Sequence, residues 1–182
     1  MILRGVQKNL EEDPAERAIV LRTARLLLTP LSRLDEAEHA RASGNAAEAL
    51  RDTRAAELQW REHDFGPWAI RDADGNFLGG AELRFAGDGI EGIAHNEVEA
   101  GWWVTESRRN EGIATEAMRV AIADVWSRAG VESVTAYIAE GGNESSRRLA
   151  ASLGFTVRSH GRGRFGEPMT VYELQRARWL PE

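Results

Sequence analysis

The chain has 182 residues, of which 42% are hydrophobic and 29% are charged, proportions typical of one soluble globular domain. Its formal net charge of -6 argues against a general nucleic-acid surface, and the lack of cysteine excludes disulfides, thiolate catalysis and cysteine-based metal sites. No apolar run approaches the ~18 residues of a membrane span, and Met1–Leu21 lacks the core of a signal peptide, so a cytoplasmic protein without a membrane partner is expected.

The start of the chain is polar. Residues 1–18 include Glu11-Glu12-Asp13-Pro14, which predicts an extension ahead of a single domain formed by residues 19–182. That domain is expected to begin with one strand over Ile19–Leu28.

Two helices are expected next. Ser32 and Asp35 have the spacing of a capping box, which predicts a short helix that ends near Ala42. Asn45 is a candidate N-cap for a second helix that runs to about Glu62.

A hairpin and a further strand follow. Strands over Pro67–Arg71 and Phe77–Phe85 are expected on either side of Asp72-Ala-Asp-Gly-Asn76, which is a strong hairpin-turn signal. A loop that opens at Gly87 leads to a strand that ends in Val104. Within this strand two sets of residues alternate, as in a strand with two different faces: Val98, Ala100 and Trp102 against Glu99, Gly101 and Trp103.

The period then changes to that of a helix. Apolar residues recur every four positions from Ile113 to Trp126, which predicts a long helix that ends near Gly130. Trp60, Phe65 and Trp68, earlier in the chain, are expected in the core or in the wall of a pocket.

The last third of the chain again alternates strands with a helix. A strand over Val134–Ala139 precedes a helix that begins at Asn143, and strands over Phe155–His160 and Met169–Leu174 come last. Gly161–Gly166 matches the dinucleotide pattern G-x-G-x-x-G, but a strand follows it where that pattern needs a helix, so a basic hairpin loop is expected. The predicted order is β-α-α-β-β-β-α-β-α-β-β, an α/β fold with a mixed sheet and helices on both faces.

The strand-to-helix junction Arg108–Ala114 suits an anion. Such a junction offers unpaired backbone N–H groups and the positive end of a helix dipole. Gly112 and Ala114 are small enough for a phosphate to approach the backbone, and Asn110 tolerates a positive φ in a tight turn. The alternative is an ordinary turn without a ligand.

Arg109-x-x-Gly112-x-Ala114, after a strand that ends in Trp102-Trp-Val104, resembles the acetyl-CoA pyrophosphate loop of the GNAT N-acetyltransferases. The order of elements over residues 20–176 is similar to theirs. The segments Thr23–Leu28 and Ala114–Ala117 resemble the branch that acetylates ribosomal-protein N-termini. The family often has Pro at the position of Glu106 and Gly at that of Asn110, and the backbone donors survive both differences. The resemblance implies that acetyl-CoA is the cosubstrate and that no metal is used. The residues implied to contact acetyl-CoA are Trp103, Val104, Arg109, Asn110, Glu111, Gly112, Ile113 and Ala114.

Asn143-Glu-Ser-Ser146 is a second candidate site. As an N-cap, Asn143 would accept a hydrogen bond from the Ser146 N–H, which is worth about 1 kcal/mol. Together with Leu153-Gly-Phe155 the segment resembles the fourth-helix motif of the family. That resemblance implies that Asn143 contacts the pantetheine arm and that Ser146 protonates the departing thiolate. Many family members have a tyrosine there, and this helix has none.

Glu99 is the candidate general base. A single carboxylate on a strand is usually solvent-facing, whereas the resemblance implies that Glu99 faces the acceptor and takes its proton through water. Glu82, one strand away, and the loop residue His95 are weaker candidates.

The predicted function is transfer of an acetyl group from acetyl-CoA to a primary amine, either a protein N-terminus or a small molecule. Direct attack by the amine needs no protein nucleophile, which fits a chain without cysteine. One alternative is a non-catalytic acyl-CoA-binding or sensing domain. Another is an RNA-binding module whose contacts come from the C-terminal arginines Arg158, Arg162, Arg164, Arg176 and Arg178. The sequence leaves the oligomeric state open, including a homodimer.

Overall fold

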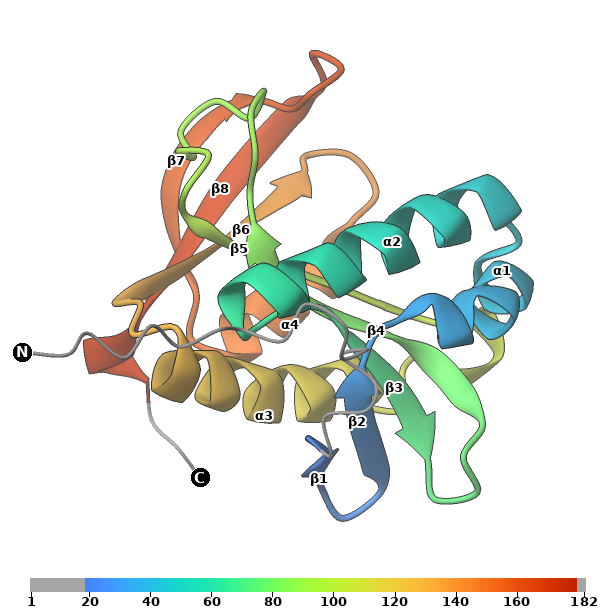
Figure 1. Ribbon diagram of the computed structural model, residues 1–182. Helices are drawn as coiled ribbons and strands as arrows, with labels where there is room; N and C mark the ends of the chain where they lie inside the picture. Colours follow the sequence, from blue (N-terminus) through green and yellow to red (C-terminus); the bar gives the residue numbers. More distant parts are fainter. Residues whose placement is uncertain (1–18, 180–182) are drawn as a thin grey trace, which may run out of the picture.

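The computed structural model describes residues 19–179, which form a mixed eight-stranded sheet and four α-helices (Figure 1). The predicted extension, residues 1–18, lies outside the described residues. The strands are β1 (Leu21–Arg22), β2 (Leu26–Pro30), β3 (Trp68–Asp72), β4 (Phe77–Phe85), β5 (Val98–Val104), β6 (Ser133–Ala139), β7 (Thr156–Arg162) and β8 (Pro168–Gln175). The helices are α1 (Glu36–Ser43), α2 (Ala46–His63), α3 (Ile113–Arg128) and α4 (Glu144–Ser152). None of the helices within residues 19–179 is long and apolar enough to cross a membrane.

The strand order is β1-β2-β3-β4-β5-β6-β8-β7, and only β5 and β6 are parallel neighbours among these strands. These two strands are in register at a single pair, Glu99 with Thr135, whereas β4 and β5 pair from Gly79 to Phe85. The Thr135 hydroxyl donates to the Val98 carbonyl oxygen at 3.2 Å and reinforces this one junction. The sheet is therefore weakly joined at its centre.

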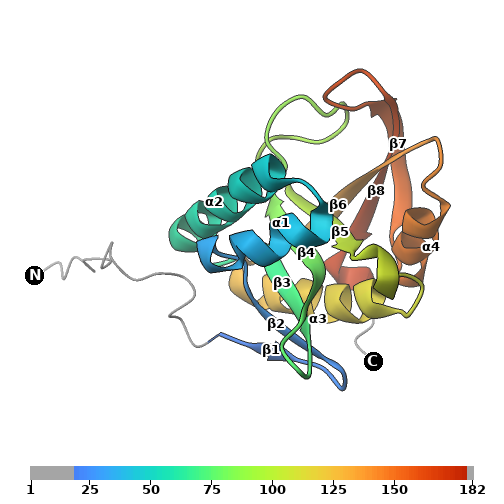
Figure 2. The ribbon, with the colours of Figure 1, turned by 90° about the vertical axis from the view of Figure 1, so that its right-hand side faces the viewer.

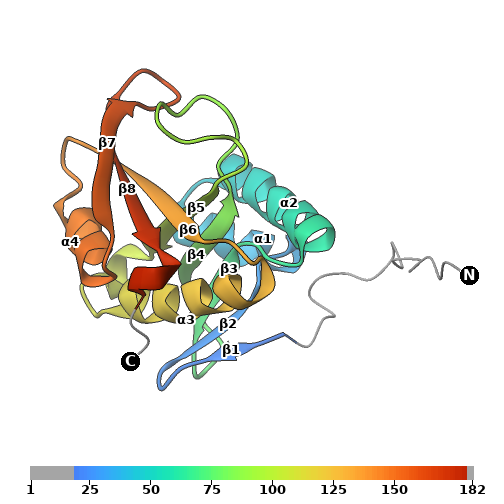
Figure 3. The same ribbon diagram turned by 90° about the vertical axis from the view of Figure 1, so that its left-hand side faces the viewer.

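Helices cover both faces of the sheet, as predicted. α1 and α2 lie on one face, and α3 lies on the other (Figures 1 and 2). α4 belongs to the α3 side, where Arg119 of α3 donates to the Ser152 carbonyl oxygen at 3.3 Å (Figure 3). α2 is held by Trp60, which packs edge-on against Trp68 with ring centroids 4.7 Å apart and donates to the Pro67 carbonyl oxygen at 2.7 Å.

The predicted core aromatics and helix starts are confirmed. Trp60, Phe65 and Trp68 are all buried. Ser32 and Asp35 form the predicted capping box, and Asn45 accepts a hydrogen bond from the Glu48 N–H at 3.1 Å at the start of α2. Gly161–Gly166 lies in the β7–β8 hairpin as expected, with Gly163 N–H donating to the Glu167 carbonyl oxygen at 2.9 Å.

The prediction of one strand over Ile19–Leu28 is wrong, because the segment folds back on itself as β1 and β2. Leu21 pairs with Leu28, and the two strands are antiparallel. Thr23 closes the turn between them. Its N–H donates to the Leu26 carbonyl oxygen at 3.0 Å, and its hydroxyl accepts from the Leu26 N–H at 2.9 Å. This local closure adds one strand to the predicted order.

Candidate active site

The segment between β5 and α3 has the backbone of an anion-binding turn. Asn110 has φ 66° and Gly112 has φ 77°, both in the left-handed region, as expected from their residue types. Gly112 is the N-cap of α3, and no side chain among the described residues caps this end of the helix. The first N–H groups of α3 therefore point into the turn without a side-chain partner from residues 19–179.

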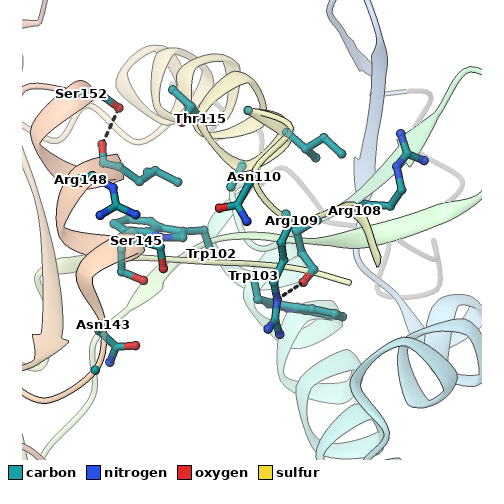
Figure 4. A pocket seen from close by; sticks show the side chains of 17 residues that line it. Trp102, Trp103, Arg108, Arg109, Asn110, Thr115, Asn143, Ser145, Arg148 and Ser152 are labelled. Carbon is teal, nitrogen blue, oxygen red and sulfur yellow. Dashed lines mark hydrogen bonds between the residues drawn. The ribbon is translucent and has the colours of Figure 1, made fainter. Parts of the chain in front are cut away.

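A cavity of ≈ 640 Å³ lies over this turn (Figure 4), and we call it the loop cavity. Its charged lining residues are Arg108, Arg109 and Arg148, and no acidic side chain of the described chain lines it. The end of β5, the start of α3 and α4 form its walls: Trp102, Trp103, Val104, Asn110, Gly112, Ile113, Ala114, Thr115, Gly142, Asn143, Ser145, Ser146, Leu149 and Ser152. The arrangement suits an elongated anionic ligand.

Every residue predicted to contact the cofactor lines the loop cavity except Glu111. The Glu111 carboxylate accepts instead from the guanidinium of Arg108 at 3.0 Å. Its backbone carbonyl oxygen accepts from Arg25, which lies behind the turn, at 3.1 Å. Glu111 thus shapes the turn from outside the cavity.

Two glycines of β4 let this strand lie close against Trp103. A Cβ at Gly80 would lie 2.7 Å from Nε1 of the Trp103 indole, and one at Gly79 would clash with the Trp103 carbonyl oxygen. On the α1 side the indole meets the buried His39 edge-on, with ring centroids 4.9 Å apart. The wall of the cavity is therefore fixed by tight packing.

The predicted capping bond of Asn143 is absent from the described part of the chain. Asn143 does precede α4, but its ψ of 39° departs from the extended backbone of an N-cap, and its side chain makes no capping hydrogen bond. The residue is exposed and lines the cavity (Figure 4). Its amide group is consequently not committed to the helix end.

A second cavity of ≈ 320 Å³ adjoins the first, and we call it the acidic cavity. The two cavities share three lining residues, Trp102, Asn143 and Ser146. The charged lining residues of the acidic cavity are Glu82, Arg84, Glu99 and Glu167. The rest of the lining is Ala100, Gly101, Tyr137, Ile138, Ala139 and Met169.

Glu99 is buried at the base of this cavity, with 3% of its surface exposed, so the solvent-facing alternative is wrong. Its Oε1 accepts from Arg84 at 3.2 Å. Its Oε2 is buried without a hydrogen-bond partner among residues 19–179, and the guanidinium of Arg164 lies 3.8 Å away from it. Burial raises the pKa of Glu99, an effect that Arg84 opposes and the negative charge of Glu82 adds to.

Glu82 and His95, the weaker candidates for a base, have different surroundings. The Glu82 carboxylate accepts from Arg84 at 2.5 Å. Burial lowers the pKa of Arg84, but the charges of Glu82 and Glu99 outweigh burial and raise that pKa, so the guanidinium stays charged. His95 is exposed in the loop after β4 and lines neither cavity.

Tyr137 is the functional candidate that sequence reasoning missed. It comes from β6 and lines the acidic cavity. Burial raises the pKa of its hydroxyl, and the charge of Glu99 adds to that shift, so the group keeps its proton at neutral pH. The sequence shows only that Tyr137 is the one aromatic residue of its predicted strand, and the pairing that places this strand beside β5 is seen in the structure.

Three of the arginines considered for RNA contact are engaged within the chain. Arg158 forms an ion pair with Glu97 at 2.5 Å, and Arg162 donates to the Gly166 carbonyl oxygen at 2.8 Å. Arg164 donates to the carbonyl oxygen of Ala86. The Arg158 and Arg164 contacts hold the β7–β8 hairpin against the loop before β5, and the Arg162 contact lies within the hairpin.

Comparison with known proteins gives a consistent result. A family model described as acetyltransferase (GNAT) domain matches residues 25–156. A structure described as a GNAT-family acetyltransferase from Bordetella pertussis has 28% sequence identity and a TM-score of 0.75, over 85% of this chain and 98% of that one. A search among curated proteins found no match.

Two further structures share the fold at lower identity. Ribosomal-protein-S5-alanine acetyltransferase from Vibrio fischeri is 13% identical, with a TM-score of 0.68 over 90% of this chain and 100% of that one. Mycobacterium smegmatis RimJ, in complex with CoA-disulfide, is 18% identical, with a TM-score of 0.67 over 86% of this chain and 84% of that one.

Proposed function

This chain belongs to the GNAT acetyltransferase family, and from that membership we propose that it transfers the acetyl group of acetyl-CoA to a primary amine. The observation that carries the proposal is the contact between the two cavities. A positively charged cavity over a helix N-terminus meets a negatively charged one at Trp102, Asn143 and Ser146. An anionic cofactor and a cationic acceptor would therefore meet at these three residues.

The loop cavity fits acetyl-CoA by its chemistry. The left-handed turn and the uncapped N-terminus of α3 present backbone N–H groups to a pyrophosphate. Arg108, Arg109 and Arg148 add positive charge, and the uncommitted amide of Asn143 can bond the amide-rich pantetheine arm. Acetyl-CoA would supply the acetyl group as a reactive thioester.

Glu99 has the burial and charge of a general base. An amine must be neutral to attack, so a proton has to leave the ammonium form. The raised pKa of Glu99 makes its carboxylate a stronger proton acceptor than an exposed glutamate. Its Oε2, buried and without a hydrogen-bond partner in the described chain, is the atom that can accept the proton directly or through water.

Two hydroxyls can protonate the thiolate that leaves when the new nitrogen–carbon bond replaces the carbon–sulfur bond. Ser146 lines both cavities and is our first candidate. Tyr137 lines the acidic cavity from β6 and would take the role of the tyrosine that α4 lacks.

The decisive experiment is release of CoA thiol from acetyl-CoA over a panel of amines and peptides. Turnover that depends on the amine supports the proposal, with acetylated product identified by mass spectrometry. Tight binding of CoA without turnover of any amine would favour the non-catalytic acyl-CoA-binding alternative. Binding of RNA with a steep salt dependence would favour the RNA-binding alternative.

A further inference from the structure

We infer that the acceptor carries a second positive charge close to the reacting amine and no carboxylate beside it. This inference rests on the proposed function and narrows its substrate class. It starts from the charges of the acidic cavity, where the three carboxylates of Glu82, Glu99 and Glu167 face one guanidinium, that of Arg84.

Neighbouring groups reduce this excess of negative charge without cancelling it. From the β7–β8 hairpin, the guanidinium of Arg164 lies 3.8 Å from Glu99 and offsets one of the three carboxylates, while it also donates to the Ala86 carbonyl oxygen. From α2, Asp52 adds a further carboxylate, whose pKa is raised by burial and then by the charge of Glu82. Tyr137, from β6, keeps its proton because burial and Glu99 raise its pKa.

Internal pairing leaves particular oxygens for a ligand. Arg84 is shared between Glu82 at 2.5 Å and Glu99 at 3.2 Å, so it is not available to hold a substrate carboxylate. Glu99 Oε2 is buried and accepts no hydrogen bond from residues 19–179. Glu167, which lines the cavity, accepts through Oε2 from the Phe165 N–H at 2.9 Å, and a carboxylate with one hydrogen bond keeps further lone pairs for a ligand. Glu99 from β5 and Glu167 from the β7–β8 loop therefore offer sites for two cationic groups.

The test is a set of three acceptors with the same four-carbon chain and amine: 1,4-diaminobutane, 1-aminobutane and 4-aminobutanoate. We expect kcat/KM to fall by about tenfold at each step in that order. The first step removes the second positive charge of the acceptor, and the second step adds a negative charge, which the carboxylates of the cavity repel. The steps should shrink as salt is raised. Two peptides, Ala-Arg-Ala-Ala-amide and Ala-Glu-Ala-Ala-amide, test whether the acceptor with the second positive charge is a peptide N-terminus or a free diamine.

Glu167→Gln should lower kcat/KM for 1,4-diaminobutane more than for 1-aminobutane. Glu132→Gln, which removes an exposed carboxylate outside both cavities, should leave the two values unchanged. Equal rates for all the acceptors, or preference for the carboxylate-bearing ones, would overturn the inference while leaving the amine acetyltransferase intact. Absence of turnover with every amine would overturn the proposed function and this inference together.

A separate set of contacts, behind the loop cavity, points to Arg25 as a positioning residue for the cofactor turn. Arg25 lies in the β1–β2 turn and donates to Glu116 Oε2 from Nε at 2.8 Å and from Nη2 at 2.6 Å. Its Nη1 donates to the Glu111 carbonyl oxygen at 3.1 Å. The other Glu116 oxygen accepts from the Thr23 hydroxyl.

These bonds join the first turn of α3 to the turn that precedes it. Glu116 lies in the first turn of α3, and its N–H donates to the Gly112 carbonyl oxygen at 3.0 Å. Arg25 Nη2 is also the nearest atom to a Cβ placed at Gly112, at 3.6 Å. Arg25 thus holds the backbone on the side away from the ligand, and preorganises the N–H groups without touching it.

The test compares Arg25→Ala and Arg25→Lys with Arg33→Ala. Arg33 is the matched control, because it also forms a 2.6 Å ion pair, with Glu57, away from the cavities. We expect Arg25→Ala to raise the Kd for CoA and the KM for acetyl-CoA about tenfold while kcat at saturation changes little, with a smaller effect for Arg25→Lys. Arg33→Ala should leave CoA binding unchanged.

Calorimetry on the folded variants separates positioning from stability. A lower melting temperature with the wild-type Kd for CoA would show that the Arg25 contacts only stabilise the fold, and would overturn the assignment. If the wild-type chain does not bind CoA, the proposed function fails. If the wild-type chain binds CoA and the Arg25 variants bind it equally well, only the role of Arg25 fails.

Discussion

The loop cavity and the acidic cavity differ in charge and in how that charge is held. Three arginines and no acid of the described chain line the first, and the backbone supplies its N–H donors. In the second, Glu82, Arg84 and Glu99 are already paired with one another. Arg108 is also paired, with Glu111 at 3.0 Å, so a ligand in the loop cavity gains chiefly the backbone N–H groups of α3, whereas a ligand in the acidic cavity perturbs an existing balance of charge. Substitutions should accordingly affect affinity in one cavity and proton transfer in the other.

The largest effect is expected from Gly112→Asp. The substitution forces a side chain onto a backbone with φ 77° and directs a carboxylate toward Arg25 Nη2, which lies 3.6 Å from the Cβ position, so it should distort the turn whose N–H groups would bind the pyrophosphate. CoA should then no longer raise the melting temperature, as it would for the wild-type protein by mass action. Gly130→Asp is the matched control, because Gly130 has φ 62° near the other end of α3, and no atom of the described residues lies within 4 Å of the position that a Cβ would take there. Unchanged CoA affinity in folded Gly112→Asp would contradict the role of the turn.

Glu99→Gln tests the acidic cavity. The shape is kept and the proton acceptor is lost, so kcat should fall by roughly 10²–10⁴-fold. The loss should be greatest at neutral pH and shrink toward the pKa of the amine, where more acceptor is already neutral.

The pH–rate profile gives the sign of this effect. Because burial raises the pKa of Glu99, its carboxylate forms at a higher pH than that of an ordinary glutamate, whose pKa is about 4.3. The wild-type kcat/KM should therefore drop as pH falls through that raised pKa, and Glu99→Gln should remove this acid limb. A flat profile at the wild-type rate would exclude Glu99 from the reaction, and a raised KM with unchanged kcat would make it a substrate-orienting group.

Ser146→Ala and Tyr137→Phe compare the two hydroxyls near the shared boundary. Removal of the hydroxyl that protonates the thiolate should lower kcat by about 10²-fold, with little change in the KM for acetyl-CoA. Melting curves of both variants serve as the control. A loss of activity no larger than the loss of stability would assign a structural role to the residue.

The smallest effect is expected from Asn143→Ala. Because Asn143 makes no capping bond within residues 19–179, the melting temperature without ligand should stay the same, while the Kd for CoA rises by a few-fold, the value of one hydrogen bond of about 1 kcal/mol. Asn45→Ala should show the reverse, since Asn45 does cap α2. A lower melting temperature for Asn143→Ala would show that the cap forms in solution.

The contrast between the cavities also explains what the sequence could predict. The turn at Asn110 and Gly112 is local, because the residue types that tolerate positive φ are visible in one contiguous stretch. The acidic cavity joins β4, β5, β6 and the β7–β8 hairpin, and no local pattern brings Glu82 beside Glu167. Tyr137 was missed for that reason.

Two local predictions failed on backbone conformation. The predicted strand runs through Thr23–Arg25, but the Thr23 side chain closes a turn there and splits it. Asn143 has the spacing of a cap, yet its ψ of 39° removes the side chain from the helix end. A side-chain hydrogen bond decided the outcome at Thr23, and the backbone dihedral angle decided it at Asn143.

The single register pair between β5 and β6 gives the sheet a mechanical property. Strands β1–β5 and strands β6–β8 each have continuous ladders, but Glu99 and Thr135 are the one bridge between them among the described strands. A small rotation about this bridge would break few backbone hydrogen bonds, so we expect the two parts of the sheet to move relative to each other here more easily than elsewhere. Trp102 lies on one part, and Asn143 and Ser146 follow β6 on the other. Since both cavities share these three residues as walls, a rotation that changes the width of one cavity would also change the width of the other.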